Sequence, residues 1–228
     1  MYTNVNLAAP VGVLMFLGTG AVVSILTLTF AFSLVSMKLI LAKWVTAALL
    51  VVLGGYFALV LVFSFVSNTE VLARGEEKHF CEIDCHLAYS IVSVVKTKSL
   101  GAASDTINAA GTFYVITVKT RFDENTISPR RGNGQLQPNP RAVTVVDENG
   151  TAFSPTVYDQ ESLARIGITG KPISTPLRPA EAYTTTFVFD LPSNANHPTL
   201  LINEADPITH LIIGHENSIA HKKTSFEI

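Results

Sequence analysis

Residues 11–35 read VGVLMFLGTGAVVSILTLTFAFSLV, and residues 45–66 read VTAALLVVLGGYFALVLVFSFV. These runs of 25 and 22 residues contain no Asp, Glu, Lys or Arg. Each is long enough to cross the hydrocarbon core of a bilayer, which takes roughly 20 apolar residues. Residues 36–44 between them are too few for anything but a tight turn, so the two helices must run antiparallel. The sequence therefore predicts a two-helix transmembrane hairpin within residues 1–67.

Positive charge in the turn predicts the orientation of this hairpin. Lys38 and Lys43 are its only charged residues, and both fall in the predicted turn, just before Trp44. Cytoplasmic loops carry an excess of Lys and Arg. We therefore expect the turn in the cytoplasm. Both termini and the C-terminal domain then lie on the periplasmic or extracellular side of the cytoplasmic (inner) membrane.

The two runs are typical of an anchor. Neither holds an ionisable residue, whereas channels and carriers place polar or charged groups at mid-membrane. A cleaved signal peptide fits neither run, because the first has no positive leader region and the second no small-x-small cleavage site. The lipid bilayer is therefore the first predicted partner.

The rest of the chain has the composition of a water-exposed domain. All 18 acidic residues and 14 of the 16 basic ones lie past Ser67, which gives this part a formal charge of about −4. This balance argues against a nucleic-acid partner, which would require a clustered basic face. We expect residues 68–86 to form a membrane-proximal linker, and residues 87–228 to form one domain long enough to bury a core.

In this domain the apolar period changes to two, as in β-strands. Residues 112–122 place Tyr114, Ile116, Val118 and Phe122 on one face. Other strands are expected at residues 87–95, 142–146, 152–158, 183–191, 199–202, 209–213 and 224–228. The sequence DENG at residues 147–150 predicts a hairpin turn, and residues 160–166 fit a short helix. The pattern predicts an antiparallel β-sandwich of about seven to eight strands.

Three blocks of this domain resemble a known family. Residues 111–119 (GTFYVITVK), 145–153 (VVDENGTAF) and 177–192 (LRPAEAYTTTFVFDLP) are similar to successive blocks of a bacterial extracytoplasmic immunoglobulin-like domain family of uncharacterised function. Its relatives include the sandwich of a secreted mycobacterial immunoprotective antigen. The resemblance covers residues 87–228 and implies an immunoglobulin-like fold in a surface-exposed protein, without implying an activity. This chain departs from the family pattern in having a helical hairpin instead of a lipoprotein signal.

One short stretch, HFCEIDCH at residues 79–86, carries both cysteines of the chain and two histidines. An oxidising compartment favours a disulfide between Cys81 and Cys85. Such a bridge needs Cα atoms within about 7 Å, whereas residues four apart on an extended strand lie roughly 13 Å apart. The segment would therefore have to turn. Free thiols are the second interpretation.

His79, Cys81, Cys85 and His86 are also candidate ligands. Two thiols and two imidazoles suit copper or zinc, and His210, His215 or His221 are further candidates for the same shell. The spacing Cys81-x-x-x-Cys85-His86 resembles the covalent haem c attachment motif with one extra residue. The plan of two helices and an outer β-domain also resembles subunit II of haem–copper oxidases. That dinuclear copper motif is absent, because Tyr89 and Val92 occupy its histidine and methionine positions.

No motif in the sequence predicts a reaction. A Gly-rich phosphate loop, His-Glu-x-x-His and Gly-x-Ser-x-Gly are all missing. A hydrolase with a spatially assembled triad has no support beyond available Ser, His and Asp. We expect a protein without catalytic residues or cofactor, acting as an interaction or accessory subunit that binds another membrane or envelope protein. The alternative is an electron-transfer module holding haem c or copper at Cys81, Cys85 and His86.

Overall fold

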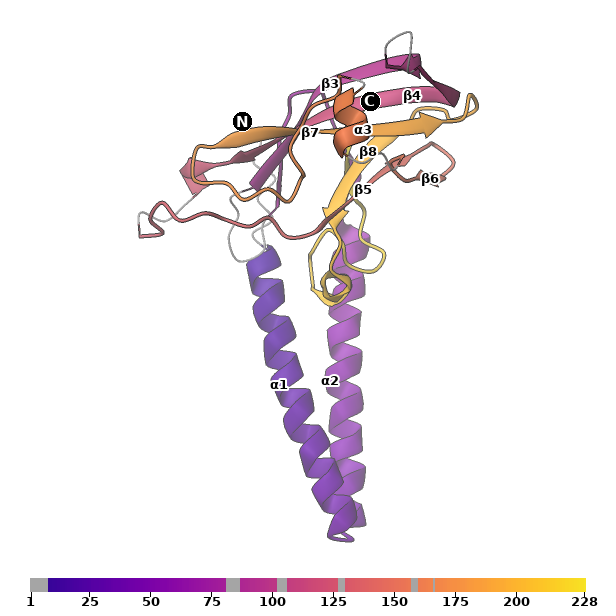
Figure 1. Cartoon of the computed structure of the whole chain (residues 1–228). Coiled ribbons are helices and arrows are strands. Elements are labelled where there is room, and N and C mark those ends of the chain that lie inside the picture. Colours follow the sequence, from indigo (N-terminus) through magenta and orange to yellow (C-terminus); the bar gives the residue numbers. More distant parts are fainter. Residues whose placement is uncertain (1–7, 81–86, 102–105, 127–129, 157–159, 166) are drawn as a thin grey trace. The chain divides into compact units, whose positions relative to one another are not determined.

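The computed structural model describes residues 8–80, 87–101, 106–126, 130–156, 160–165 and 167–228 (Figure 1). The chain divides into two compact units. One holds the two long helices together with Pro207–Lys222, and the other holds Thr69–Asp206 and Lys223–Ile228. Pro207–Lys222 thus belongs with the helices, which corrects the expectation of a single domain over residues 87–228.

A helical hairpin is formed by α1 (Ala8–Val35) and α2 (Leu39–Val66). The turn between them is tight, as predicted. Met37 adopts a positive φ of 57°, and the amide of Lys38 donates to the carbonyl of Ser33 at 2.8 Å. A left-handed residue followed by such a backward bond is a common way to end a helix.

The start of α2 differs from the prediction. The helix begins at Leu39, six residues before the expected start at residue 45. Residues 39–44, LILAKW, contain no Gly or Pro, so nothing in their backbone preference interrupts the helix. Lys43 therefore lies in α2, and only Lys38 remains in the turn.

Both helices are apolar around their whole circumference. Val11–Val35 and Leu39–Val66 are long and apolar enough to cross a membrane, and only 6% and 17% of their most apolar stretches are buried. The hydroxyl groups of Ser24, Thr27 and Thr29 each donate to a carbonyl of their own helix at 2.8 Å. Polar groups satisfied within one helix suit apolar surroundings.

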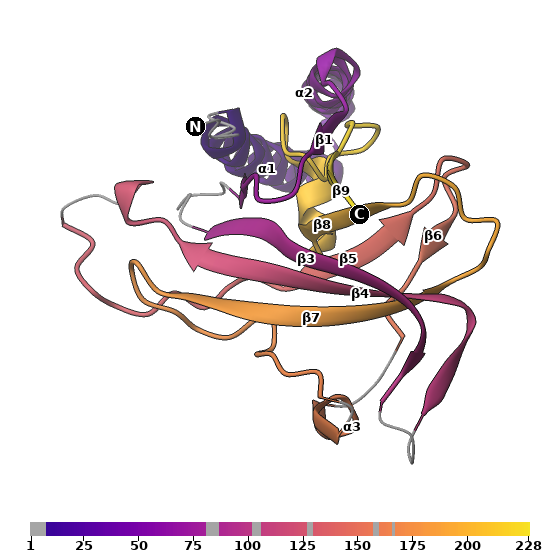
Figure 2. The ribbon, with the colours of Figure 1, turned by 90° about the horizontal axis from the view of Figure 1, so that it is seen from above.

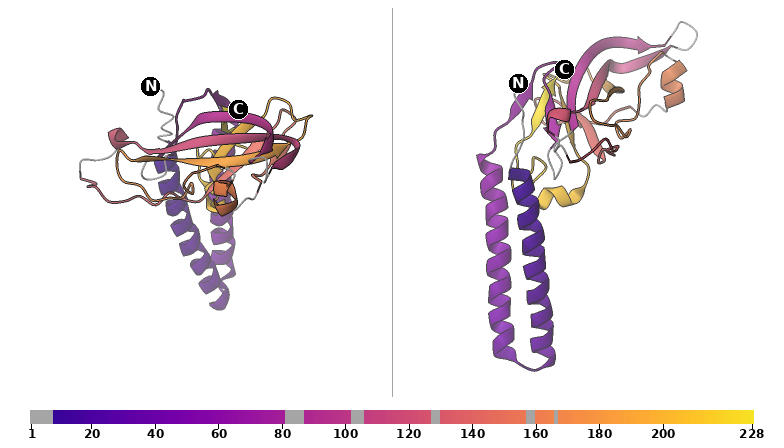
Figure 3. Two further views of the ribbon diagram at one scale, coloured as in Figure 1. Left: turned by 45° about the horizontal axis from the view of Figure 1, so that its top comes forward. Right: turned by 90° about the vertical axis from the view of Figure 1, so that its left-hand side faces the viewer.

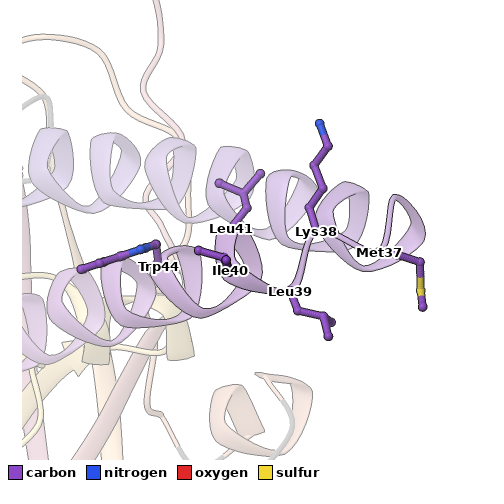
Figure 4. A pocket seen from close by; sticks show the side chains of 6 residues that line it. All are labelled: Met37, Lys38, Leu39, Ile40, Leu41 and Trp44. Atoms are coloured by element: carbon purple, nitrogen blue, oxygen red, sulfur yellow. The ribbon is translucent and has the colours of Figure 1, made fainter.

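Apolar side chains also gather around the hairpin turn. Figure 4 shows them lining a surface hollow of about 590 Å³ together with one lysine: Met37, Lys38, Leu39, Ile40, Leu41 and Trp44. Trp44 is 72% exposed. A tryptophan and a lysine at the end of an apolar hairpin are typical of a membrane–water interface.

Pro207–Lys222 contains no strand in the place where residues 209–213 were expected to form one. A 3₁₀ helix covers Pro207–Leu211 instead, and the prediction is wrong. The reason is packing within the helical unit. Ile213 is buried against Tyr56 and Val60 of α2, so the apolar residues of this segment face a helix and not a sheet.

Nine strands in the described residues form two sheets (Figures 1 and 2). The first has the order β1–β9–β8–β5–β6, from β1 (Glu70–Leu72), β9 (Thr224–Glu227), β8 (Thr199–Glu204), β5 (Arg141–Val146) and β6 (Ala152–Phe153). The second has the order β2–β3–β4–β7, from β2 (Lys78–Phe80), β3 (Leu87–Leu100), β4 (Ile107–Phe122) and β7 (Ala182–Leu191). The pair β1–β9 is parallel, so the first sheet is mixed and the prediction of a wholly antiparallel sandwich is wrong.

Side chains of both sheets meet in one core, which makes this unit a β-sandwich. The predicted apolar face of β4 is confirmed, because Ile116, Val118 and Phe122 are fully buried. They pack in one cluster with core residues of the other strands: Tyr89, Ile91, Val143, Val145, Tyr183, Phe189, Leu191, Leu200, Ile202 and Phe226.

A second, smaller apolar cluster lies on the outer face of the four-stranded sheet. The short helix α3 (Gln160–Arg165), predicted at residues 160–166, contributes Leu163 to it. Leu163 packs against Leu100, Phe113 and Val188. Figure 3 shows α3 beside the curled far ends of β3 and β4. This helix covers one end of the outer face.

The expected linker at residues 68–86 contains two strands of the sandwich. β1 places Leu72 in the core, and β2 places Lys78 and Phe80 there. Three-residue strands are held by their pairing and not by their own periodicity. The linker prediction is therefore wrong over these strands.

Charged side chains are buried inside this core. The guanidinium of Arg141 forms an ion pair with the carboxylate of Glu204, its register partner on β8, and both side chains are at most 3% exposed. The guanidinium also lies 4.1 Å from the ring centroid of Phe80, and its Nε donates to the hydroxyl of Tyr89 at 3.2 Å. Cation–π contact and hydrogen bonds help to offset the cost of burying the charge.

Lys78 bonds the two sheets together. It belongs to β2 of the four-stranded sheet, and its ammonium donates to the carbonyls of Ile202 at 2.8 Å and Thr224 at 2.9 Å in the five-stranded sheet. The lysine is 1% exposed. Charge-assisted hydrogen bonds to buried carbonyls are stronger than neutral ones, so this contact fixes β2 against β8 and β9.

We predict that Arg141→Ala lowers the free energy of unfolding by about 3–5 kcal/mol, because it leaves the carboxylate of Glu204 buried without its cation. The double variant Arg141→Leu/Glu204→Leu should recover most of this loss. Arg178→Ala is the control, since Arg178 is exposed and should cost under about 1 kcal/mol. Urea unfolding in mild detergent, followed by circular dichroism, measures all three. Equal midpoints for Arg141→Ala and the control would contradict the prediction.

Candidate functional site

The longest open strand edge of the described sandwich belongs to β3. β4 pairs with β3 along its whole length, whereas β2 covers its other side only over Leu87, Ala88 and Tyr89. One further bond runs from the amide of Gly75 to the carbonyl of Ile91. From Val92 to Leu100, no described strand pairs with this side of β3. Unpaired edge groups are a template for pairing with another chain.

The opposite edge of the same sheet is covered. There the amide of Thr156 donates to the carbonyl of Val188 at 2.7 Å, and the amide of Lys171 donates to the carbonyl of Thr184 at 2.8 Å. Loop segments therefore occupy the edge of β7 and frame a hollow of about 400 Å³ beside Phe187. The contrast identifies β3 as the accessible edge.

Apolar side chains accompany the open edge. Val92 is 50% exposed and Val95 is 54% exposed. Val95 forms one cross-strand row with Val115 and Val188. The latter two belong to the small cluster that includes Leu163 of α3. Val95 thus continues an apolar surface to the edge of the sheet, where a partner can cover it.

Two lysines of β3 are held away from the edge. The ammonium of Lys96 lies 4.6 Å from the ring centroid of Tyr114. That of Lys98 donates to the carbonyl of Gly111 at 2.6 Å and to the hydroxyl of Thr112 at 2.8 Å. All three acceptor residues are in β4. Edge lysines often protect a strand against pairing, but here both ammonium groups lie over the neighbouring strand.

Register shifts limit the length of the usable edge. They lie between Ile91 and Ser93 and between Thr97 and Ser99. Irregularities of this kind bend a strand and interrupt its ladder. The segment between them, residues 93–97, is a short regular stretch that fits one extended peptide strand. We define residues 92–98 as the β3 edge.

The first residue of the Cys/His stretch lies in a network of charged side chains. His79 pairs with Ala88, and Ala88 pairs with Arg121, so His79 and Arg121 flank one small residue in adjacent strands. His79 Nε2 lies 3.2 Å from Asp123 Oδ2. Arg121 binds Glu77 through two bonds of 2.7 and 2.8 Å. The register of three strands therefore creates this network, which we call the His79 network.

Arg121 controls the charge state of the carboxylates around it. Its hydrogen bonds to Glu77 lower the pKa of that carboxyl, against the opposing effect of burial. For Asp123, burial alone would raise the pKa, but hydrogen bonds from Arg121 and Asn125 outweigh it and hold the pKa at about 2. Both groups are therefore carboxylates at neutral pH, and the pKa of Arg121 itself is raised, first by its bond to Glu77.

His79 is the only described member of the predicted ligand set. Cys81, Cys85 and His86 lie outside the described residues, so the disulfide, the metal set and the haem attachment all stay predictions. His79 Nδ1 is buried and has no hydrogen-bond partner among the described residues. Within the described part of the chain, no group of three His, Cys, Asp or Glu side chains is placed to hold a metal.

The three C-terminal histidines that were candidate ligands lie in Pro207–Lys222 and form hydrogen bonds within that segment. His210 Nδ1 lies 2.6 Å from the carbonyl of Asn217, and His215 Nδ1 accepts from the amide of Asn217 at 3.0 Å. His221 Nδ1 lies 2.6 Å from the carbonyl of Lys222. Each of the three therefore has a structural partner within its own segment.

Sequence reasoning missed the β3 edge and the buried charges. The strand was predicted to end at residue 95, whereas β3 continues through the sequence KTK at residues 96–98 to Leu100. The signal for the buried pair was present. Arg141 shares its alternation with Val143, and Glu204 shares its alternation with Ile202, so extending each strand at period two places both charges inside.

Comparison with known proteins gives no family. No protein-family model matches the chain, and no curated protein matches it. Among solved structures, it is similar to the secreted Mycobacterium tuberculosis protein MPT63, with a TM-score of 0.43 and 12% identity over 71% of this chain and 98% of that one. A conserved hypothetical protein of Bacillus anthracis has a TM-score of 0.41 and 17% identity over 57% and 89%. An uncharacterised β-sandwich protein of Clostridium difficile has a TM-score of 0.39 and 12% identity over 71% and 95%. All three TM-scores are below 0.5, so the sandwich assignment rests on the strand order and the shared core.

We predict that the His79 network makes stability depend on acid pH. The folded pKa of Asp123 is about 2, below the unfolded value of roughly 3.9. Its stabilisation is therefore fully present above about pH 4 and is lost as the pH falls towards 2. Asp123→Asn should reduce this dependence, leaving the part that belongs to Glu77, and should lower the free energy of unfolding at pH 7 by roughly 2 kcal/mol.

Urea midpoints between pH 2 and pH 7 measure this effect. Glu148→Gln, an exposed carboxylate in the β5–β6 turn, is the matched control and should retain the wild-type pH profile. An Asp123→Asn profile that falls in parallel with wild type would assign the acid sensitivity to other groups.

Proposed function

We propose that this chain is a membrane-anchored, extracytoplasmic β-sandwich of the immunoglobulin-like kind, acting as an interaction or accessory subunit of an envelope membrane complex. The observation that carries the proposal is the open β3 edge, with Val92 and Val95 exposed beside backbone that no described strand pairs on this side. An extended segment of a partner adds to such an edge through main-chain hydrogen bonds, and the adjacent side chains supply specificity.

The two long apolar helices support the membrane anchor. Their side chains are mostly exposed, so a bilayer or other membrane helices must cover them. Lys38 in the turn supports a cytoplasmic location for the turn. Lys43 lies one turn into α2, close enough for its long side chain to reach the same interface. The sandwich then lies outside the cytoplasm, on the outer side of the inner membrane.

The charges of the β3 edge favour a partner other than a second copy. Although the ammonium groups of Lys96 and Lys98 lie over β4, pairing two β3 edges would gather four such cations around one short ladder, and like charges brought close across strands are destabilising. A neutral or acidic extended segment avoids this repulsion. We therefore propose a segment of another membrane or envelope protein as the occupant, with the bilayer as the second partner and no nucleic acid.

The proposed role requires neither catalysis nor a cofactor. The charged groups of the His79 network pair with one another, with Arg121 bridging Glu77 and Asp123. Such a network positions strands and neutralises charge. We propose that the protein works by binding.

We predict that a photo-crosslinking amino acid at Val95 captures a partner in native membranes, because Val95 lies on the open edge. The same amino acid at Thr151, an exposed residue of the β5–β6 turn, is the control and should capture nothing. Adding Val92→Lys to the Val95 variant should reduce the adduct several-fold, since a charge on the edge opposes pairing.

The mass of the adduct decides between occupants. A mass other than twice that of the chain supports a different protein. An adduct of twice the chain mass would show pairing between two copies and contradict the heteromeric proposal. A Val95 variant that inserts into the membrane and gives no adduct would contradict a role for the β3 edge.

A redox or metal-binding function is the second candidate, and the geometry of His79 favours it. Its Nε2 is held by Asp123, and its buried Nδ1 has no partner among the described residues. Metal-ligating histidines are commonly oriented by a carboxylate in this way. His79 could therefore offer Nδ1 to an ion that the thiols of Cys81 and Cys85 and the imidazole of His86 would also bind.

An absorption spectrum and an intact mass of the unreduced, detergent-purified protein separate the two functions. We predict a mass lower than the sequence mass by two hydrogen atoms and no visible band, as a Cys81–Cys85 disulfide requires. The variant Cys81→Ser/Cys85→Ser is the control and should show no mass deficit. A Soret band with a haem-sized mass increase, or a copper charge-transfer band, would replace the binding role with electron transfer.

A further inference from the structure

Pro207–Lys222 is a compact segment that packs on the outer ends of α1 and α2. The hydroxyl of Tyr56 donates to the carbonyl of Leu211 at 2.7 Å, and Ile213 is buried with Val60. The amide of Lys222 donates to the hydroxyl of Ser67 at 2.9 Å. These contacts lie within one compact unit and place the segment beside the last turns of α2.

On α1, the segment approaches so closely that only a glycine fits. A Cβ atom at Gly12 would lie 2.0 Å from the carbonyl oxygen of Ile213. The ring of Phe16, one turn further along α1, lies 6.5 Å from that of Tyr56. The segment therefore touches both helices of the hairpin.

The contact with α2 lies well inside the apolar run. Tyr56 precedes the end of α2 at Val66 by ten residues, which is roughly 15 Å along a helix axis. About 20 residues suffice to cross the hydrocarbon core, so a span that starts between Leu39 and Val45 reaches its far boundary between Ala58 and Ser64. Tyr56 and Val60 lie at this boundary or just inside it. The segment beside them therefore lies in the outer leaflet, close to the boundary between acyl chains and headgroups.

The segment buries several polar side chains while it exposes two large apolar ones. Thr209, His215, Asn217 and Ser218 are buried. Asn217 Nδ2 donates to the hydroxyl of Thr209 at 2.8 Å, and the amide of Asn217 donates to His215 Nδ1. Of its four isoleucines, Ile212 and Ile213 are buried, whereas Ile208 is 52% exposed and Ile219 is 47% exposed. A loop that buries Asn and His while exposing two isoleucines is suited to apolar surroundings.

We propose that Pro207–Lys222 is a membrane-interface element whose Ile208 and Ile219 insert into the outer leaflet at the boundary between headgroups and acyl chains. The inference rests on the proposed insertion of α1 and α2 in a bilayer. The occupant of this apolar surface is lipid, because the surface lies beside the lipid-facing part of the same helices. Burial of two isoleucines there stabilises the attachment of the segment to the bilayer.

The single tryptophan of the chain makes the test specific. Wild-type Trp44 reports on the hairpin itself. In a Trp44→Phe background, Ile219→Trp and, separately, Ile208→Trp report on the segment. Thr151→Trp in the same background is the water-exposed control. Each full-length protein is reconstituted into phosphatidylcholine–phosphatidylglycerol vesicles whose acyl chains are brominated near the headgroup, and tryptophan emission is compared with that in unbrominated vesicles.

We expect brominated lipid to reduce the emission of Trp44 and of both segment variants to a similar extent, and to leave the control unchanged. Quenching of Trp44 without quenching at positions 208 and 219 would overturn the interface element and leave the anchor intact. No quenching of Trp44 in folded, reconstituted protein would overturn the anchor itself. Two independent positions guard against a variant that disturbs its own surroundings.

Discussion

The buried ammonium of Lys78 is the contact on which the arrangement of the sandwich depends. It belongs to a three-residue strand, yet it bonds carbonyls of β8 and the first residue of β9 in the other sheet. An unpaired charge in a core is strongly destabilising, so β2 is confined to the one position where these carbonyls are in reach. Alternation along β2 then places His79 on the opposite face. There Arg121 lies in the same cross-strand row, and Asp123, directly after β4, lies 3.2 Å from the imidazole.

The same short strand determines which surface is available for binding. Because β2 runs antiparallel to β3 and begins only at Lys78, it pairs with β3 no further than Tyr89, and no described strand covers this side of β3 beyond that point. The four-stranded sheet thus has one edge covered by loops and one that is accessible. The open β3 edge follows from the shortness of the pairing between β2 and β3, and the His79 network follows from its register.

Sequence patterns predicted those elements whose apolar periodicity extends over several turns or residue pairs. The two helices, the hairpin turn at residues 147–150 and the long strands β4 and β7 are confirmed. The three-residue strands β1 and β2 could not be predicted, because their stability comes from pairing and from Lys78, and not from a local pattern. The strand expected at residues 209–213 does not form for a related reason. The conformation of this segment is determined by the packing of Ile213 against Tyr56 and Val60.

The site was less accessible to sequence reasoning than the fold. The cluster of Cys and His residues was visible by composition, and the structure describes His79 alone from it. The partner of His79, Asp123, is 44 residues away in the chain, and only strand register brings the two together. By contrast, Arg141 and Glu204 lay within reach of prediction, because each continues the alternation of a recognised strand by one step.

The parallel pairing of β1 with β9 has a mechanical consequence. Within the described residues, the chain leaves the helical unit for the sandwich twice, once before β1 and once before β9. Both segments enter the five-stranded sheet in the same direction, so a pull on either of them is shared through the hydrogen bonds between β1 and β9.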